Sequence, residues 1–428
     1  MQRGGFDARR EPTIFPEHPG EGRIGWAQKG RCSPEDHGRR TWNAIYRGTG
    51  AKLQTMAGLY VHIPFCAQAC TYCDFHFTTK LGDRDRMVQA LIQELKTSLP
   101  QWQDEIFTTL YFGGGTPSLL SPSALQEIAE VAFSEANWDL QEWTLEANPE
   151  DLDAPTLDGL KASGVNRLSI GVQSFQPDVL QWMRRIHGAE RAEDVVQQAA
   201  TAGFEHLSLD LIYGVPVGKE DRWTDDIGRA CALPVDHLSC YILTAEPKTR
   251  YGDQLSKGQV APPPDEKVIQ EYEVLCQATK AGGFSHYEVS NFARKGGESR
   301  HNSAYWSGTP YLGIGPGAHS HRHEKRWWNG RSNARYMQAA ESTNLPSQRE
   351  EEALLPKDQF NEALITGLRR VQGVCPKAVK AATGIDVHAQ PALSSLIEKG
   401  QCEWHEGRLR IPEAHWPMGD GITLELMN

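Results

Sequence analysis

Several features that mark common protein classes are missing from this 428-residue chain. It has no apolar run of the roughly 20 residues that cross a bilayer, so membrane insertion is not expected. Its N-terminus carries charges but lacks the apolar stretch that a secretory signal peptide requires. The chain also lacks a Lys/Arg-rich run, and its formal net charge of -11 argues against nucleic-acid binding, because phosphate contacts need a basic surface.

The nine cysteines do not form the pattern of a disulfide framework. A chain of this size can bury a sizeable core, so it does not need covalent cross-links for stability. Thiols of a chain without an export signal remain reduced in the cytoplasm, and we therefore expect a cytoplasmic protein. One group of cysteines is closely spaced, namely Cys66, Cys70 and Cys73, and it follows an apolar segment at 59–63.

The CxxxCxxC spacing lets three thiolates surround one metal centre. A structural zinc site would need four protein ligands, but no second cysteine pair follows, since the next cysteine is Cys231. An iron-sulfur cluster with three cysteine ligands leaves one iron free for an outside ligand. The spacing resembles that of the radical S-adenosylmethionine enzymes, which favours the cluster and leaves zinc as the alternative.

From residue 58 onward, short apolar runs alternate with amphipathic stretches. Apolar residues repeat at helical spacing within 87–95 and 125–132, and two alanine-rich stretches, 154–163 and 192–202, end near glycines suited to terminate a helix. Strands that alternate with helices require a parallel sheet with right-handed crossovers. The six expected strands cover 59–63, 109–112, 143–147, 167–172, 206–212 and 237–243. We therefore predict an α/β fold with a partial (β/α)6 barrel of the TIM type.

Polar residues and glycines fall at the ends of these strands, where parallel α/β folds place their chemistry. The GGGTP segment at 113–117 follows the second strand, and its glycines would let backbone amides approach a ligand closely. The other polar residues at or just beyond strand ends are Glu146, Gln173, Arg185 and Asp210. Together they predict a cofactor site beside the three cysteines.

From Gly58 to about Asn344 the chain resembles the oxygen-independent coproporphyrinogen dehydrogenase family, and within it the haem chaperone branch. The matching segments are YVHIPFC, CTYCDF, YFGGGTPSLL, EANPE, RLSIGVQSF, RRIHG, LDLIYGVP and HNSAYW. The resemblance implies a [4Fe-4S] cluster on Cys66, Cys70 and Cys73 whose fourth iron site takes S-adenosylmethionine. It also implies S-adenosylmethionine contacts by Tyr60, Gly114, Gly115, Thr116, Glu146, Gln173, Arg185, Asp210 and Thr244.

Two positions distinguish the branches of that family. The dehydrogenase has a further cysteine two residues after the third ligand, whereas this chain has Phe75 there, which argues against decarboxylation of coproporphyrinogen. Conversely, HNSAYW at 301–306 resembles the HNxxYW motif associated with haem in the chaperone branch. By this resemblance His301 would ligate haem iron while Tyr305 and Trp306 lie against the macrocycle. A helix cap followed by two core aromatics is the alternative.

The resemblance thus implies a haem chaperone that binds haem and passes it to an acceptor protein. An electron donor would serve the cluster. The competing hypothesis is an enzyme, a radical coproporphyrinogen III dehydrogenase that oxidatively decarboxylates two propionates. Phe75 and the HNSAYW segment favour the chaperone.

The sequence predicts four parts. Residues 1–55 have ten Lys/Arg, six Asp/Glu and no hydrophobic periodicity, which predicts a disordered extension and makes Met56 a candidate start. Near the end of the chain, two helical patterns precede a hairpin-like pair of segments around Glu406 and Gly407, as in a small α+β winged-helix-like domain. The expected boundaries are a barrel at 56–290, a linking segment with the HNxxYW motif at 291–344 and the C-terminal domain at 345–428.

Overall fold

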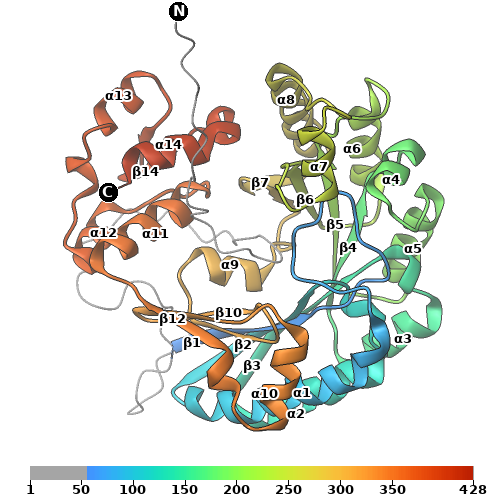
Figure 1. Ribbon diagram of the computed structural model, residues 1–428. Coiled ribbons are helices and arrows are strands. Elements are labelled where there is room, and N and C mark those ends of the chain that lie inside the picture. The colour runs from blue at the N-terminus through green and yellow to red at the C-terminus, as the bar shows by residue number, and fades with distance from the viewer. Residues whose placement is uncertain (1–54, 428) are drawn as a thin grey trace, which may run out of the picture.

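The computed structural model describes residues 55–427, and the extension predicted for 1–55 lies outside this range except for its last residue. Within the described range, no helix combines the length and the apolar character needed to cross a membrane. The chain forms a curved sheet covered by helices on its outer side, with a group of C-terminal helices facing it across the molecule (Figure 1).

Six parallel strands form the centre of the sheet in chain order, which confirms all six predicted strands. The alternating direction of the side chains along the first strand shows why such segments form strands. Leu59, Val61 and Ile63 are fully buried in the main core, whereas Tyr60 belongs to a separate cluster on the other face. The strands are β1 (Thr55–Ile63), β2 (Glu105–Gly114), β3 (Trp138–Ala147), β4 (Arg167–Gln173), β5 (His206–Tyr213) and β6 (His237–Ile242).

Helices connect successive strands and cover the outer face of the sheet (Figure 1). The four predicted helical patterns are confirmed as α1 (Arg84–Ser98), α2 (Pro122–Glu135), α3 (Ala154–Ser163) and α5 (Ala189–Thr201). In α3 the carboxylate of Asp153 accepts the Thr156 amide at 2.9 Å, and Gly164 ends the helix with φ of 102°. The structure adds α4 (Pro177–Met183), α6 (Arg222–Ala232), α7 (Arg250–Ser256) and α8 (Asp265–Ala281), which the sequence analysis did not identify.

The sheet continues beyond both edges of the six parallel strands. Next to β6 lie two antiparallel strands, β8 (Asn291–Ala293) and β7 (Ser285–Glu288). On the other side β9 (Tyr311–Ile314) runs parallel to β1 and is followed by the antiparallel strands β10 (His319–Arg322), β11 (Lys325–Asn329) and β12 (Arg349–Ala353). The sheet therefore extends past residue 290, into the segment expected to be a linker.

Two further helices lie between these added strands, α9 (Arg300–Trp306) and α10 (Asn333–Glu341). The carboxylate of Glu94, on α1, holds this region to the barrel. It accepts hydrogen bonds from the Gly315 amide at 2.8 Å and from the Tyr336 hydroxyl at 2.6 Å, and it pairs with Arg349 at 2.9 Å. Because Glu94 is fully buried, each of these donors offsets the cost of removing its charge from water.

The C-terminal part is a small α+β unit, as predicted. Its helices are α11 (Pro356–Leu368), α12 (Pro376–Thr383), α13 (Leu393–Glu398) and α14 (Gly419–Leu426), with a hairpin of β13 (Glu403–His405) and β14 (Arg408–Arg410). Glu406 and Gly407 both have positive φ, 49° and 78°, as a two-residue type I′ hairpin turn requires. In Figure 1 this unit faces the barrel, and α9 lies between the two.

Candidate functional site

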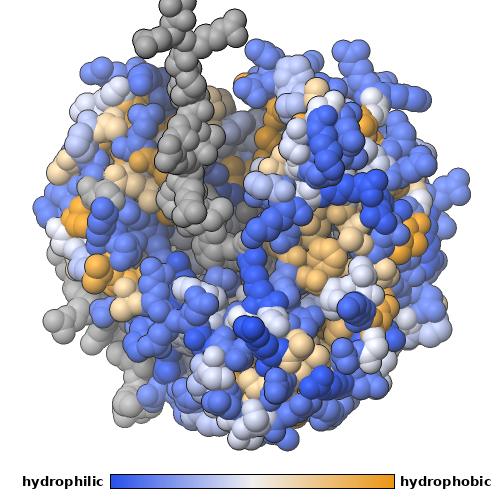
Figure 2. Space-filling view, in the orientation of Figure 1, coloured by the Kyte–Doolittle hydropathy of each residue, from blue (hydrophilic) through white to orange (hydrophobic). Residues whose placement is uncertain are grey.

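A cavity of about 1790 Å³ is lined by the loop after β1, by the carboxyl ends of the parallel strands, by α9 and by α11. Figure 2 shows a mainly hydrophilic surface on this face, with hydrophobic side chains gathered near the loop after β1. Phe75 and Ile186 line the cavity there and are 39% and 53% exposed. The cavity therefore has an apolar rim on the side of the cysteines.

The loop after β1, which carries the three cysteines, is fastened at both its base and its middle. At the base the Cys66 amide donates to the Thr78 carbonyl at 3.0 Å, and the Thr78 amide donates to the Pro64 carbonyl at 2.8 Å. In the middle the Thr71 hydroxyl donates to the Trp182 carbonyl of α4 at 2.6 Å. The loop is thus held by the barrel over the ends of its strands.

The three thiols of Cys66, Cys70 and Cys73 are half-buried and line the cavity. Burial raises the pKa of the Cys66 thiol to about 11 and raises that of Cys73 as well, so the thiolate forms need a cationic partner. Three cysteine ligands around one centre leave a coordination site open for a further ligand, as in an iron-sulfur cluster held by three cysteines.

The glycines that end β2 allow close packing against the cysteine loop. A Cβ on Gly115 would lie 2.6 Å from the Phe65 carbonyl oxygen, and the Gly115 amide donates to the Ile63 carbonyl at 2.8 Å. Gly114 has φ of 114°, which a residue with a side chain adopts only with strain. The glycines therefore bring the end of β2 and the cysteine loop together at the cavity wall.

Glu146, near the end of β3, is held by two donors from β2. The Tyr111 hydroxyl donates to one carboxylate oxygen at 2.7 Å, and the Gly114 amide donates to the other at 3.0 Å. Burial raises the pKa of Glu146 to about 7, and the neighbouring Asp210 adds to the rise, while the two hydrogen bonds oppose it. A cationic ligand group in the cavity would favour the ionised carboxylate.

Arg185 links the end of β4 to the cysteine loop. Its Nη2 donates to the Asn148 side-chain oxygen at 2.5 Å and to the Gly171 carbonyl at 2.6 Å, and its Nη1 lies 3.6 Å from the Cys70 sulfur. The Asn148 amide in turn donates to the Thr116 hydroxyl at 3.2 Å. Within the described part of the chain the buried Nε of Arg185 has no hydrogen-bond partner. A guanidinium beside these sulfurs fits a negatively charged centre.

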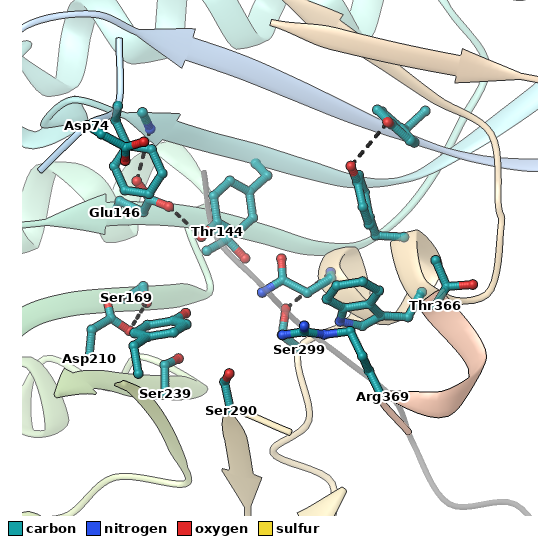
Figure 3. A pocket seen from close by; sticks show the side chains of 18 of the residues that line it. Asp74, Thr144, Glu146, Ser169, Asp210, Ser239, Ser290, Ser299, Thr366 and Arg369 are labelled. Atoms are coloured by element: carbon teal, nitrogen blue, oxygen red, sulfur yellow. Dashed lines mark hydrogen bonds between the residues drawn. The ribbon is translucent and has the colours of Figure 1, made fainter. Parts of the chain in front are cut away.

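Asp210 on β5 faces the cavity between two serines from neighbouring strands, Ser169 on β4 and Ser239 on β6 (Figure 3). The Ser169 hydroxyl donates to Asp210 at 3.1 Å. Burial raises the pKa of Asp210 to about 6, although hydrogen bonds from both serines lower it. These three side chains could bind hydroxyl groups of a ligand.

Most of the residues implied by the resemblance meet at this cavity. Its wall includes Cys66, Cys70, Cys73, Gly114, Gly115, Thr116, Glu146, Gln173, Arg185, Asp210 and Thr244. Two do not line it. Tyr60 lies behind the wall, where its hydroxyl is 3.0 Å from His62 Nδ1, and the buried His301 packs on Tyr111 with ring centroids 4.9 Å apart.

The HNSAYW segment forms α9, whose start is fixed by a buried carboxylate. Glu142 accepts the backbone amides of Arg300 at 2.9 Å and His301 at 2.8 Å, and it pairs with Arg167 at 2.8 Å. Burial alone would raise the pKa of Glu142, but Arg167 and the two amides hold it below its ordinary value. Three residues of the segment, Asn302, Tyr305 and Trp306, line the cavity.

The far wall of the cavity comes from α11 and β11. The Arg369 guanidinium lies 5.3 Å from the centre of the Trp306 ring, and Arg326 forms an ion pair with Glu362. Figure 3 shows Arg369 and Thr366 on one side of the pocket and Glu146 and Asp210 on the other. Charged side chains of both signs line each end of the cavity. Glu146, Asp210 and Arg185 lie on the barrel side, and Arg326, Glu362 and Arg369 lie on the α11 side.

Sequence reasoning missed Asn148 and Tyr111, which hold Arg185 and Glu146 in place. A signal for both was present. Asn148 directly follows β3 within the EANPE segment. Tyr111 lies two positions before the glycine at 113 on β2, so both point to the same face of the sheet.

Much of this chain matches known proteins in sequence. The Radical SAM superfamily matches residues 60–227. The chain is 35% identical to "Heme chaperone HemW" of Bacillus subtilis over 350 residues, which cover 81% of this chain and 92% of that protein. It is 37% identical to the protein of the same name from Mycobacterium tuberculosis (strain H37Rv) over 381 residues, 86% of this chain and 94% of that protein.

Among solved structures, coproporphyrinogen III oxidase (HemN) from Escherichia coli, a radical SAM enzyme, superposes with a TM-score of 0.77. The match covers 92% of this chain and 94% of that chain at 22% sequence identity. At that identity the match establishes the fold alone. It confirms the predicted radical SAM barrel together with its smaller C-terminal part.

Proposed function

The chain belongs to the HemW family of radical SAM proteins, and from that membership we propose that it is a haem chaperone. It binds haem and passes it to an acceptor protein, while a [4Fe-4S] cluster and exchangeable S-adenosylmethionine occupy the barrel end of the cavity. The observation that carries the proposal is the shared cavity. Tyr305 and Trp306 of the HNSAYW segment and the three cysteines line the same space.

Cys66, Cys70 and Cys73 would hold the cluster, and Arg185 beside Cys70 would offset its negative charge. When bound, the cluster would supply a redox centre and an iron site open to the amino and carboxylate groups of S-adenosylmethionine. Glu146 faces the cavity and would attract the positively charged amine or sulfonium of that ligand. Asp210, with Ser169 beside it, would accept hydrogen bonds from the ribose hydroxyls.

Haem would lie at the α9 end, against the aromatic rings of Tyr305 and Trp306. Arg369, next to Trp306, would bind a propionate. His301 would be the axial ligand through Nε2, because its Nδ1 is engaged by the Thr109 hydroxyl at 2.8 Å. The residue is 8% exposed and does not line the cavity, so iron binding would require a shift of α9 toward the cavity.

The dehydrogenase alternative is weakened at Phe75. That side chain stands at the cavity rim, 39% exposed, where the dehydrogenase pattern has a reactive thiol. An apolar ring there cannot donate or accept a proton or a hydrogen atom as a thiol can. The acceptor protein and an electron donor for the cluster are the partners that this proposal requires.

A haem titration tests the proposal. Protein purified without oxygen is titrated with haem and followed by its Soret absorbance, for wild type, His301→Ala and His321→Ala. His321 is the matched control, because it is a neutral histidine that lines the same cavity. We expect His301→Ala to weaken haem binding at least tenfold, the cost typical of losing even a supporting group at a metal site. Equal affinity of wild type and His301→Ala would contradict the assignment, as would selective loss in His321→Ala.

A further inference from the structure

Away from the cavity, three side chains of different chemistry meet where the C-terminal part packs on the barrel. Cys276 lies on α8, His286 on β7 and Glu413 at the start of the 3-10 helix η8 (Glu413–Met418). Their sulfur, nitrogen and oxygen atoms all lie within 4.8 Å of one another. Neither the cluster nor haem uses any of them.

The contacts of the His286 ring place one of its nitrogens directly beside a carboxylate. Nε2 lies 3.4 Å from the Val289 carbonyl oxygen, and Nδ1 lies 2.6 Å from a carboxylate oxygen of Glu413. Both neighbours are hydrogen-bond acceptors, and a neutral imidazole carries only one N–H. If Nε2 keeps the proton for Val289, then Nδ1 and the carboxylate face each other as two bases. In that tautomer a cation is needed between them. In the other tautomer Nδ1–H donates to the carboxylate, and a metal ion would replace that proton.

Cys276 adds a third atom that can ligate a metal ion. Its sulfur lies 3.9 Å from the same Nδ1 atom of His286, so a third donor points to the same place. The sulfur also interacts with the Tyr272 hydroxyl, one turn earlier on α8, and a metal ion would compete with that contact. A cation with sulfur, nitrogen and oxygen ligands uses all three.

The surroundings of His286 resemble the support that metal-binding histidines receive in proteins. Its ring stacks on Phe292 with centroids 3.9 Å apart, and the Trp416 ring packs edge-on at 4.4 Å. The Val289 carbonyl oxygen lies 3.4 Å from Nε2, on the side where an outer carbonyl supports many metal-binding histidines. The Glu413 side chain is 55% exposed, so water can reach an ion bound there.

We propose that Cys276, His286 and Glu413 bind one zinc ion, with water as the fourth ligand. Zinc is the ion suited to such a mixed set of sulfur, nitrogen and oxygen donors in a tetrahedral arrangement, whereas magnesium and calcium take oxygen ligands. The ion would join η8 to α8 and β7, although His286 and Glu413 lie 127 positions apart in the sequence. It would therefore fasten the C-terminal part to the barrel.

Zinc binding to the full-length, cluster-loaded protein tests this site. We expect one zinc per chain, with an X-ray absorption spectrum at the zinc edge that shows one sulfur ligand at about 2.3 Å and lighter ligands at about 2.0 Å. Cys276→Ser and His286→Gln should each weaken zinc binding at least tenfold. Cys231→Ser, a half-buried thiol on the neighbouring α6, is the matched control and should bind zinc as wild type does.

Zinc should also raise the melting temperature of wild type and of Cys231→Ser, but not that of Cys276→Ser, because it binds the folded state. Equal zinc affinity in wild type and Cys276→Ser would overturn the proposal. So would a spectrum with three sulfur ligands, since it would place the zinc at the cysteine loop instead.

Discussion

The Nδ1 atom of His301 lies 2.8 Å from the hydroxyl oxygen of Thr109, joining α9 to β2 across 192 residues of sequence. This bond fixes the orientation of the imidazole and leaves Nε2 as the nitrogen that can bind iron. It also holds the ring against Tyr111, inside the wall of the cavity. The haem proposal therefore depends on α9 leaving this position when haem binds.

If α9 must move, weakening its attachment should favour haem binding. Thr109→Val removes the hydroxyl that holds His301 but keeps the shape of the side chain. We expect faster haem association, measured by stopped-flow absorbance, because the shift of α9 breaks one hydrogen bond fewer. Thr108→Val is the control, since its hydroxyl contacts the Ala57 carbonyl instead, at 3.5 Å. A slower rate in Thr109→Val alone would argue that His301 binds iron from its present position.

Removing a cluster ligand should remove the cluster. Replacing Cys66, Cys70 or Cys73 by Ala should abolish the brown absorbance and most of the bound iron, because three ligands leave none spare. Iron and sulfide assays of protein reconstituted without oxygen measure the effect. Cys231→Ala should retain the wild-type iron content. Four irons per chain in the triple variant would show that the ligands lie elsewhere.

Glu146→Gln should weaken S-adenosylmethionine binding about ten- to a hundredfold, because a charge-assisted contact is worth roughly 1.5–3 kcal/mol. Equilibrium dialysis of the cluster-loaded protein measures it. Tyr60→Phe provides the comparison, since its hydroxyl contacts His62 behind the cavity wall, and we expect it to leave the affinity nearly unchanged. The reverse ranking of the two variants would show that Tyr60, and not Glu146, contacts the ligand.

Arg369→Met should lower haem affinity several-fold, because it removes the cation beside Trp306 while keeping an unbranched side chain. Asp420→Asn is the control, because Asp420 pairs with Arg369 at 2.9 Å from the exposed side. We expect that variant to bind haem as well as wild type or better. Haem titration of both variants measures the two affinities. Unchanged affinity in Arg369→Met would exclude a contact between Arg369 and a haem propionate.

Stability should fall as the pH falls from about 6.5 to 4. Burial lowers the pKa of His62, His301, His319 and His321 to about 4, so in this window the unfolded chain binds protons that the folded chain does not. Each histidine contributes at most about 1.4 kcal/mol per pH unit. Raised pKa values at Glu146 and Asp210 act in the opposite direction.

The variant His301→Gln isolates one of these contributions, because the opposing carboxylates are the same in both proteins. Its melting temperature should fall less steeply than that of wild type between pH 6.5 and 5. Thermal unfolding of the cluster-free protein at several pH values measures the two slopes. Identical slopes would mean that His301 takes up a proton in the folded state.

Strong local patterns made the parallel strands predictable. In β1 to β6 buried apolar residues form runs bounded by turn residues, and α3 carries both a capping aspartate and a terminal glycine. The missed helices were short or highly charged. In α6 the buried residues Trp223, Ile227 and Ala230 lie among charged neighbours, which hides their spacing.

The added strands could not be predicted for a different reason. β9 has four residues, including Gly313, and it is a strand because β1 offers an open edge to pair with. That pairing depends on contacts between residues far apart in the sequence. For the site, strand ends identified Glu146 and Asp210 correctly as cavity residues. The positions of strand ends could not show that the Tyr111 ring packs against Tyr60 and His301. Such packing depends on which segments become neighbours in the fold.

A single side-by-side assay tests most directly whether this protein is a chaperone or a decarboxylase. Wild type and Phe75→Cys, both loaded with cluster, receive S-adenosylmethionine, a reductant and either coproporphyrinogen III or haem. We predict that wild type binds about one haem per chain and forms no decarboxylated product, and that Phe75→Cys alone does not install turnover. Conversion of coproporphyrinogen III by the wild-type protein, with cleavage of S-adenosylmethionine, would contradict the account.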